Sequence, residues 1–500
     1  MNKQINHVAV AALVLLAALI VATTYWQSWA AAGLADRQDN AIQRVAQFQI
    51  KRGEIFAADG RTYLARRVVR KVQGKTLYFR RYPQGGRFAH VVGYSTAVRE
   101  RAGLERSMND YLTASNANLN TVLDTTLDKL RGGTIEGNDL ILTLRPGAQK
   151  LAYEQLAGRC GSVVALEPKT GRVLAMANSP SFDPNLMEKP GGYAKILRIQ
   201  AACPSPSPLV NRATFGHYIP GSIFKVVTAS AALDTGKYQP ESSFVDPGYC
   251  VEYGRRVTNY SDQSGPAVYG RVSLIQALVN SINSVFCNIG KPDTGIGGLR
   301  IVKQMKSFGF YSVPPLETPV NERRASGLFD DGKLFSPANA GQVDPGRLAF
   351  GQERLQVTPL QMAMVAGGVA NRGVVMEPFV VQRIRAPDGT VIRRTKPREL
   401  GRAISPQTSA QLTQMMSAAV ASGTGTAAQI PGIAVAGKTG TAETGVSGRN
   451  TVWFISFAPA DDPKVAVAVV IEATSGTGGE HAAPIARAVL QALLPSRSNT

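Results

Sequence analysis

Histidine and cysteine are scarce in this sequence. The chain has 4 histidines and 4 cysteines among 500 residues, and no two cysteines form a C-x-x-C pair. So few cysteines exclude a disulfide-scaffold protein, and the lack of a C-x-x-C pair together with only four histidines argues against a zinc-ligand cluster. The sequence also lacks a fixed internal period, which excludes collagen, a long coiled coil and solenoid repeats. We therefore expect neither a metal nor a cofactor.

Acidic residues are outnumbered, because 35 Asp and Glu stand against 55 Lys and Arg, for a net charge of +20. Such a surface favours nucleic acid, membrane headgroups or an acidic polymer. Half of the excess lies between residues 51 and 106, where 14 basic residues accompany 4 acidic ones. This β-rich stretch is either a solvated strand face or a contact for anionic lipid or cell-wall polymer. No recognition motif accompanies the charge, so we expect no nucleic-acid partner.

One long apolar stretch opens the chain, over residues 8–26. It has about the 20 residues that a bilayer-spanning helix needs, and Trp26 and Trp29 suit an interfacial aromatic belt. We expect a single-pass anchor in the cell membrane, with residues 1–7 cytoplasmic and the large remainder extracytoplasmic. A cleaved signal peptide, with Ala30-Ala31-Ala32 at the cleavage site, and a buried core helix are the alternatives.

The rest of the chain has the composition of a globular protein, with 44% apolar and 18% charged residues. Residues 27–45 read as a stalk and residues 314–345 as a long irregular excursion. Strands are predicted at 138–144, 162–167, 172–177, 451–457 and 465–471, and helices at 149–157, 222–234, 272–289 and 482–494. Strands at both ends of the later segment, with helices between, predict an α/β (α+β) fold around a central mixed sheet. We place the domain boundary before the first hairpin, which gives domains at 27–158 and 159–496.

The four cysteines, Cys160, Cys203, Cys250 and Cys287, are widely spaced. Four cysteines allow three disulfide connectivities, and the sequence does not choose among them. For Cys287 we favour the interpretation of a small buried apolar residue on a helix.

A serine and a lysine at helical spacing carry the first chemical signal. Ser222 and Lys225 open the apolar helix at 222–234, and S-x-x-K occurs once in the sequence. Residues i and i+3 share one helix face, so the amine can serve as the base that a serine nucleophile needs. Burial and a second nearby cation would keep Lys225 neutral. The start of the helix favours developing negative charge at Ser222.

Two further motifs supply the remaining groups. Ser281 and Asn283 lie in the predicted helix at 272–289, where Ser281 can relay a proton and Asn283 can orient Lys225. Lys438-Thr439-Gly440-Thr441 precedes the last strand pair, with Lys438 as the second cation and hydroxyls for a substrate carboxylate. A second K-T-G, at Lys169, sits in a hairpin turn and is read as accidental.

These three motifs in this order resemble those of penicillin-binding proteins and serine β-lactamases. Tyr218-Ile219-Pro220 before Ser222, Phe350-Gly351-Gln352, and Arg52-Gly53-Glu54-Ile55 upstream are similar to class B penicillin-binding proteins of the short actinobacterial type. The resemblance implies a penicillin-binding/serine β-lactamase-like transpeptidase domain over residues 159–496, with helices on both faces of its sheet. It also implies a non-catalytic pedestal domain over residues 27–158.

The resemblance further implies a peptidoglycan D,D-transpeptidase. Ser222 would attack the D-Ala-D-Ala amide of a stem peptide, release D-Ala and pass the acyl group to a neighbouring amine. Catalytic roles are implied for Ser222, Lys225, Ser281, Asn283 and Lys438, substrate binding for Thr439, Gly440 and Thr441, and an oxyanion hole at the backbone N–H groups of Ser222 and Thr441.

Peptidoglycan stem peptides, the lipid-linked precursor, a SEDS-type glycan polymerase and covalently bound β-lactams are the partners that the resemblance implies. A β-lactamase or D,D-carboxypeptidase on the same fold, and a non-catalytic β-lactam sensor or divisome scaffold, are the alternative functions. The sequence does not distinguish a septal role from one in elongation, and it does not identify the acceptor amine.

Overall fold

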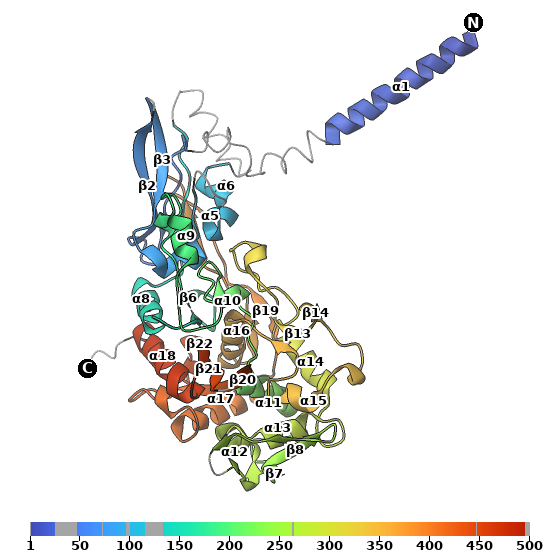
Figure 1. The fold of residues 1–500 in the computed structure, drawn as a ribbon, viewed down its shortest axis with the longest axis vertical. Helices are drawn as coiled ribbons and strands as arrows, with labels where there is room; N and C mark the ends of the chain where they lie inside the picture. The colour runs from blue at the N-terminus through green and yellow to red at the C-terminus, as the bar shows by residue number, and fades with distance from the viewer. Residues whose placement is uncertain are drawn as a thin grey trace.

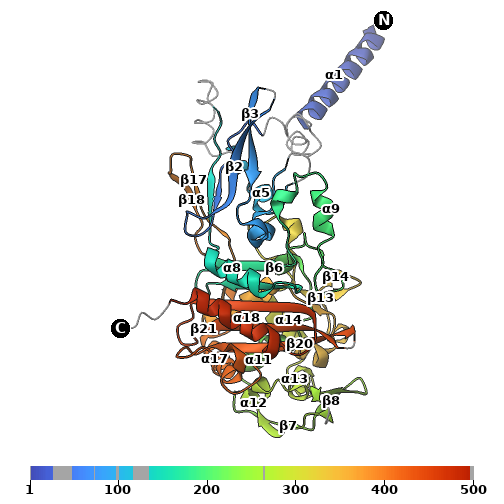
Figure 2. The same ribbon diagram turned by 60° about the vertical axis from the view of Figure 1, so that its left-hand side comes forward.

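The computed structural model describes residues 2–25, 48–72, 74–96, 101–115, 134–262, 265–446 and 448–495. From residue 48 onward the molecule is elongated, with strands β2 (Tyr63–Val72) and β3 (Lys75–Arg81) at one end (Figure 1). Strands β7 (Ser243–Asp246) and β8 (Tyr249–Glu252) lie at the opposite end (Figures 1 and 2).

Helix α1 (Asn2–Tyr25) contains the predicted anchor. Its residues 4–25 are long and apolar enough to cross a membrane, and none of their most apolar window is buried against the rest of the chain. The other anchor-related expectations, at Trp26, Trp29, Ala30–Ala32 and the stalk 27–45, lie outside the described residues.

The central sheet has five strands in the order β20-β21-β22-β5-β6. They are β5 (Gly161–Leu166), β6 (Val173–Ser179), β20 (Ala436–Val446), β21 (Arg449–Ala458) and β22 (Val465–Thr474). The predicted fold class is confirmed, with one difference of detail: every neighbouring pair runs antiparallel, whereas we predicted a mixed sheet. The reason is that three of the four pairs are consecutive strands joined as hairpins, which must run antiparallel.

Helices cover both faces of this sheet, because alternate residues of each strand point to opposite sides. On β22, Ala466, Ala468 and Val470 pack into the core cluster that contains α11 (Lys225–Asp234) and α16 (Pro359–Ala370). The intervening residues of β22 pack with α8 (Pro146–Gln155) and α18 (Gly478–Leu493). Further helices of the body are α9 (Gly192–Leu197), α10 (Arg212–Phe215), α14 (Gly298–Ser307), α15 (Pro345–Ala349) and α17 (Pro406–Ala421).

A second sheet, of six strands, forms the N-terminal part in the order β18-β17-β4-β1-β2-β3. Its other strands are β1 (Ile55–Phe56), β4 (Asp139–Leu142), β17 (Val381–Arg385) and β18 (Val391–Arg394). The short helices α4 (Ala89–Val92), α5 (Gly103–Ser107) and α6 (Asn109–Leu112) accompany it. Because β17 and β18 come from far along the chain, this sheet is shared between the two parts of the molecule.

The predicted helix at 272–289 is the main local error. The chain forms two helices there, α12 (Leu274–Val279) and α13 (Asn283–Gly290), and Ser281 lies in the break with a left-handed φ of 58°. The break turns the Ser281 backbone out of the helical path, so its carbonyl bonds to another element instead of to a later residue of its own helix.

Both disulfides that four cysteines permit are formed, Cys160–Cys203 and Cys250–Cys287. Cys287 is buried on α13 as expected, but its interpretation as a free apolar residue is wrong. The predicted excursion at 314–345 also contains a small hairpin, β13 (Gly327–Asp330) with β14 (Lys333–Phe335). Short strands complete the fold: β9 (Arg255–Thr258), β10 (Ser261–Asp262), β11 (Gly265–Pro266), β12 (Gly270–Ser273), β15 (Leu355–Gln356), β16 (Val374–Met376) and β19 (Glu399–Arg402).

Candidate active site

Ser222 lies at the start of the buried helix, in the short 3₁₀ helix η4 (Gly221–Phe224) that leads directly into α11. Side chains three residues apart eclipse in a 3₁₀ helix, so Ser222 and Lys225 share a face. Ser222 is partly exposed, whereas its neighbours Ile223 and Phe224 are fully buried. The nucleophile candidate is therefore the accessible end of an otherwise closed helix.

Lys225 is completely buried, and its amine is held by the loop between α12 and α13. Its Nζ donates to the Ser281 carbonyl oxygen at 2.6 Å and to Asn283 Oδ1 at 2.7 Å, and lies 3.2 Å from Ser281 Oγ. Burial, and then the nearby charge of Lys438, lower the pKa of Lys225 well below its usual range. Because the carbonyl and amide oxygens can only accept, they take the two hydrogens of the neutral amine and leave its lone pair free.

Lys438 approaches the same hydroxyl from strand β20. Its Nζ lies 2.9 Å from Ser281 Oγ and donates to the Thr439 carbonyl oxygen at 2.9 Å. Burial lowers the pKa of Lys438 to about 7. The Ser281 hydroxyl is thus placed between two amines, which is the geometry of a proton relay.

Two glycines, Gly221 and Gly440, allow β20 to lie against η4. The Gly221 N–H donates to the Gly351 carbonyl oxygen at 2.9 Å, and Gly221 has a left-handed φ of 55°. A Cβ on Gly440 would lie 2.8 Å from the Pro220 carbonyl oxygen, and one on Gly221 would lie 2.7 Å from that of Thr441. The backbones of Ser222 and Thr441 are therefore neighbours, as an oxyanion hole requires.

The remaining two predicted residues also lie on β20. The Thr439 hydroxyl bonds to that of Thr424 at 2.6 Å, and Thr441 Oγ1 accepts from the Gly478 N–H at 3.4 Å. All eight predicted site residues are thus brought to one region by η4, α11, the α12–α13 break and β20. Thr424 was not predicted, because it lies in a loop outside any motif and only the fold brings it beside Thr439.

Residues 161–491 match the penicillin binding protein transpeptidase domain, and residues 52–140 match the penicillin binding protein A dimerisation domain. The chain belongs to the penicillin-binding protein transpeptidase family. The predicted family is thereby confirmed.

Relatives match this penicillin-binding protein over nearly its whole length. It is 37% identical over 511 residues to the peptidoglycan D,D-transpeptidase PbpA of Mycolicibacterium smegmatis and 35% identical over 517 residues to that of Mycobacterium tuberculosis, each covering 99% of both chains. The structure of penicillin-binding protein A from M. tuberculosis as its ceftriaxone acyl-enzyme superposes with a TM-score of 0.78 and 32% identity. That match covers 90% of this chain and 100% of the other.

A second set of side chains, which the motifs did not indicate, supports the approach to Ser222. Glu472 Oε1 accepts from Tyr218 at 2.7 Å and from Arg212 at 2.8 Å, and the Trp453 indole N–H donates to the Ile219 carbonyl oxygen at 3.0 Å. These contacts fix the loop that ends at Gly221. Sequence patterns could not find them, because the five residues come from three separate parts of the chain, at 212–219, 453 and 472.

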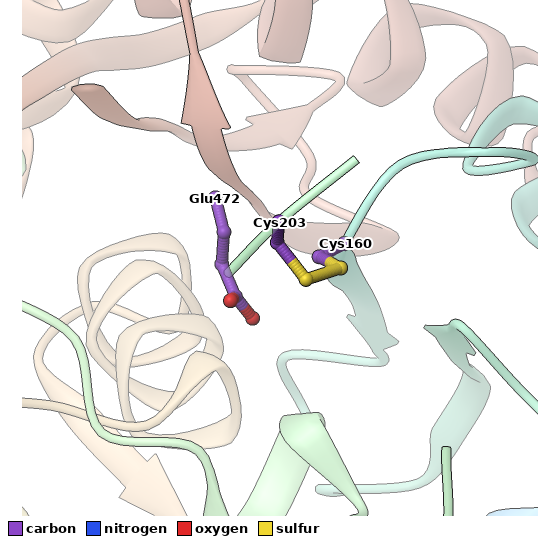
Figure 3. A group of neighbouring side chains, drawn as sticks. All are labelled: Cys160, Cys203 and Glu472. Atoms are coloured by element: carbon purple, nitrogen blue, oxygen red, sulfur yellow. A yellow bond between two sulfur atoms is a disulfide. The ribbon is translucent and has the colours of Figure 1, made fainter. Parts of the chain in front are cut away.

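Glu472 also lies beside the Cys160–Cys203 disulfide (Figure 3). Carboxylate and sulfur within 4.8 Å of each other resemble a metal-ligand group. Both sulfurs are consumed by the disulfide, however, and the carboxylate is paired with Arg212. A thiolate is what binds metal, so this group does not provide a metal site in the described part of the chain.

Proposed function

We propose that this penicillin-binding protein is a peptidoglycan D,D-transpeptidase with Ser222 as its nucleophile. The observation that carries the proposal is the Ser281 hydroxyl, which lies 3.2 Å from the Lys225 amine and 2.9 Å from the Lys438 amine. The known transpeptidases of the same length, and the acyl-enzymes that penicillin-binding protein A forms with ceftriaxone, imipenem and penicillin G, support the same activity. Peptidoglycan is the substrate, and β-lactams are covalent inhibitors.

Acylation begins with proton transfer from Ser222 Oγ to the neutral amine of Lys225. The oxygen attacks the carbonyl carbon between the two D-alanines of a stem peptide. The backbone N–H groups of Ser222 and Thr441 stabilise the oxyanion. When the C–N bond breaks, the leaving nitrogen takes a proton through the Ser281 hydroxyl, with Lys225 as its source, and free D-alanine departs.

Deacylation reverses these roles with a different amine. An amino group of a neighbouring stem peptide gives its proton through Ser281 to Lys225 and attacks the ester carbonyl. The C–O bond to Ser222 breaks, and its oxygen recovers the proton. Thr439 and Gly440 on β20, with Thr441, line the place where the carboxylate of the donor peptide binds near Lys438.

Labelling with a fluorescent penicillin tests the proposal. The wild-type chain should form a long-lived adduct whose mass maps to the peptide containing Ser222, and Ser222→Ala should abolish it. Ser230→Ala, a buried serine two turns further along the same helix, is the matched control and should label normally. Labelling of Ser222→Ala at the wild-type rate would refute the nucleophile assignment.

A second measurement separates cross-linking from hydrolysis. With a donor stem peptide and an added acceptor amine, a transpeptidase forms the cross-linked product in preference to the hydrolysed one. Rapid release of hydrolysed penicillin without an accumulated adduct would instead indicate a β-lactamase. Exclusive formation of the hydrolysed peptide would indicate a D,D-carboxypeptidase.

We also propose that α1 anchors the chain in the cell membrane with residues 27–496 outside the cytoplasm, and that a SEDS-type glycan polymerase is its partner. The observation that supports the anchor is the length and apolarity of α1, whose most apolar window of 18 residues has a mean hydropathy of 2.5. The partner is proposed from the resemblance to class B penicillin-binding proteins. Intact mass of the membrane-extracted protein should include residues 1–26, and protease added to intact protoplasts should digest the catalytic domain. Co-purification with the polymerase that depends on α1 would support the partner.

A further inference from the structure

The β2–β3 hairpin concentrates positive charge beyond what the catalytic reaction uses. Between residues 63 and 81 there are seven lysine and arginine residues and no aspartate or glutamate. Four of these cations point to one side of the ribbon, because alternate residues of a strand share a face. We call this side the basic face; it consists of Arg66, Val68, Arg70, Val72, Lys75, Leu77, Phe79 and Arg81.

The basic face carries a like-charge pair that nothing in the described chain neutralises. Arg66 is directly opposite Arg81 in the strand register, and such pairs destabilise a sheet. All four of its cations are exposed, and no carboxylate of the described residues lies within ion-pair distance of any of them. Because the repulsion between Arg66 and Arg81 is not compensated within the described chain, binding of an anion from outside the chain is favoured at this face.

The opposite face of the same ribbon shows the contrast. There Arg67 pairs with Glu136 at 2.7 Å, and the buried Arg80 pairs with Glu105 at 2.7 Å. Arg67 and Arg80 are also cross-strand neighbours, yet each has its own carboxylate. The chain therefore pairs two of the three cations of this opposite face and leaves Lys71, near the tip, without a carboxylate, whereas none of the four cations of the basic face has one among the described residues.

Apolar side chains accompany the charges on the basic face. Val72 is 44% exposed near the tip, and the Arg70 guanidinium lies 4.9 Å from the centre of the Phe79 ring. Part of the face borders a hollow of about 650 Å³ that also contains Asp183 and Glu188, whereas Val72, Lys75 and Leu77 lie outside it. Basic and aliphatic groups on one projecting surface are the combination that binds at a lipid interface.

The chain limits how far this hairpin can lie from the end of α1. Phe48, the first described residue after α1, accepts a hydrogen bond from the Tyr78 N–H at 2.7 Å and stacks on Phe79. The 22 residues from 26 to 47 can span at most about 75 Å. The strand that receives the anchor segment is thus the strand that carries Lys75 and Arg81.

We propose that the basic face docks on anionic phospholipid headgroups of the membrane that holds α1. This inference rests on the anchor proposed above, and it adds a second, charge-dependent membrane contact. A second copy of this chain is a poor occupant, because a two-fold axis would place the basic face against itself. Each cation near an anionic surface should contribute about a fivefold preference for the bound orientation.

The test uses the full-length chain in lipid nanodiscs. All four native cysteines are in disulfides, so Thr76→Cys at the exposed hairpin tip provides one reactive thiol for a fluorescent dye. Nitroxide-labelled lipid should quench the dye in discs that contain phosphatidylglycerol, and much less in discs of phosphatidylcholine alone. High salt should remove the difference, because it screens exposed charges.

The quadruple variant Arg66→Gln, Arg70→Gln, Lys75→Gln and Arg81→Gln should lose the phosphatidylglycerol-dependent quenching. The matched control removes four exposed cations outside the N-terminal sheet: Arg255→Gln and Arg256→Gln on β9, Arg271→Gln on β12 and Arg300→Gln on α14. The control should quench like wild type, and both variants should keep wild-type penicillin labelling, which shows that they fold.

Several results would overturn the proposal. Equal quenching in the two lipids would mean that the tether alone determines the position of the hairpin. Quenching that survives in the hairpin variant, or that appears only when an acidic wall polymer is added, would assign the basic face to another role. If the chain enters neither disc, the anchor is refuted and this inference with it, although penicillin labelling would still report on catalysis.

Discussion

At the scale of single residues, the chemistry depends on two buried lysines that share one hydroxyl. Desolvation disfavours the charged form of each amine, and the positive charge of Lys438 further disfavours that of Lys225. Neither effect is available to a lysine on the surface. The fold thereby lowers the pKa of Lys225 well below its usual range, as the proposed base requires, and lowers that of Lys438 to about 7.

The first prediction concerns the pH dependence of acylation. Protonation of Lys225 removes the base, so the rate of penicillin acylation should fall as the pH drops through the lowered pKa of Lys225. Lys438→Gln removes the neighbouring positive charge, so that pKa rises and the acid limb moves to higher pH. The maximal rate should also fall by about 100-fold, because the contact with Ser281 is lost.

The control for this experiment is Lys169→Gln, at the second K-T-G of the chain. Lys169 is exposed and pairs with Asp462 at 3.0 Å on the surface, so the profile should not change. Stopped-flow acylation between mildly acidic and alkaline pH measures both variants. An acid limb that stays in place in Lys438→Gln would contradict the electrostatic coupling.

At the scale of elements, the site exists because strand β20 touches the start of the nucleophile helix. The contact is backbone to backbone, since Gly440 lies against Pro220 and Ile223, and Gly221 lies against Thr441. No side chain can be inserted there without separating the two elements. The glycine of the K-T-G motif is thus required for the close approach of the two elements.

The second prediction follows from this contact. In Gly440→Ala the new Cβ would lie 2.8 Å from the Pro220 carbonyl oxygen, so β20 must move away from Ser222. A displacement of about 1 Å should lower the acylation rate by about 100-fold. Gly147→Ala on α8, where a Cβ meets nothing within 4 Å, should keep the wild-type rate. Wild-type acylation by Gly440→Ala would show that the close approach is dispensable.

The third prediction separates the two disulfides. Cys287 lies one helical turn after Asn283 on α13, and its bond to Cys250 ties that helix to β8. Replacing Cys250 and Cys287 by Ala should lower the free energy of unfolding by about 4 kcal/mol for a closed loop of this size, and should also slow acylation. Replacing Cys160 and Cys203 should reduce stability similarly but slow acylation less, because that disulfide lies beside Glu472 and not on a helix that carries a residue of the site. Thermal unfolding and acylation rates distinguish these outcomes, and equal slowing in both would argue against a specific role for α13.

At the scale of the whole molecule, the N-terminal sheet and the catalytic domain are built as one unit. Strands β17 and β18 leave the catalytic part, complete the N-terminal sheet beside β4 and return. The sheet also rests on a buried ionic cluster, in which Glu105 accepts from Arg52 and pairs with Arg80, each at 2.7 Å. Burial raises the pKa of Glu105, but these two guanidinium groups outweigh it and hold the pKa below 4.5.

The fourth prediction tests this coupling. Glu105→Gln leaves two buried guanidinium groups without a counter-charge and should destabilise the chain by about 3–5 kcal/mol. Trp453 is the one tryptophan beyond residue 29, and it is buried in the catalytic sheet, so its fluorescence reports on that domain. We expect its unfolding transition to shift to lower denaturant concentration. An unchanged Trp453 transition, with a separate early loss of the N-terminal sheet, would show that the two parts unfold independently.

The sequence by itself determined the family, the nucleophile helix and the strand hairpins. These features are encoded locally: hairpins such as β5–β6 have short turns between apolar runs, and Ser222 and Lys225 are three residues apart. The long apolar run at 8–26 likewise needs no tertiary context to be recognised. Motif order added Ser281, Asn283 and Lys438 to the predicted site, although their distances from Lys225 could not be read from spacing.

Tertiary structure alone decided the rest. The helix break at Ser281 is invisible to helix periodicity, because the contacts of its carbonyl and hydroxyl with Lys225 favour a left-handed backbone there. The disulfides and the pairing of β17 with β4 join residues that lie far apart in the sequence. Thr424 and Thr439 are only 15 residues apart, but they belong to different elements that the fold brings together. Local propensity describes one segment at a time, whereas these contacts depend on which segments the packed core brings together.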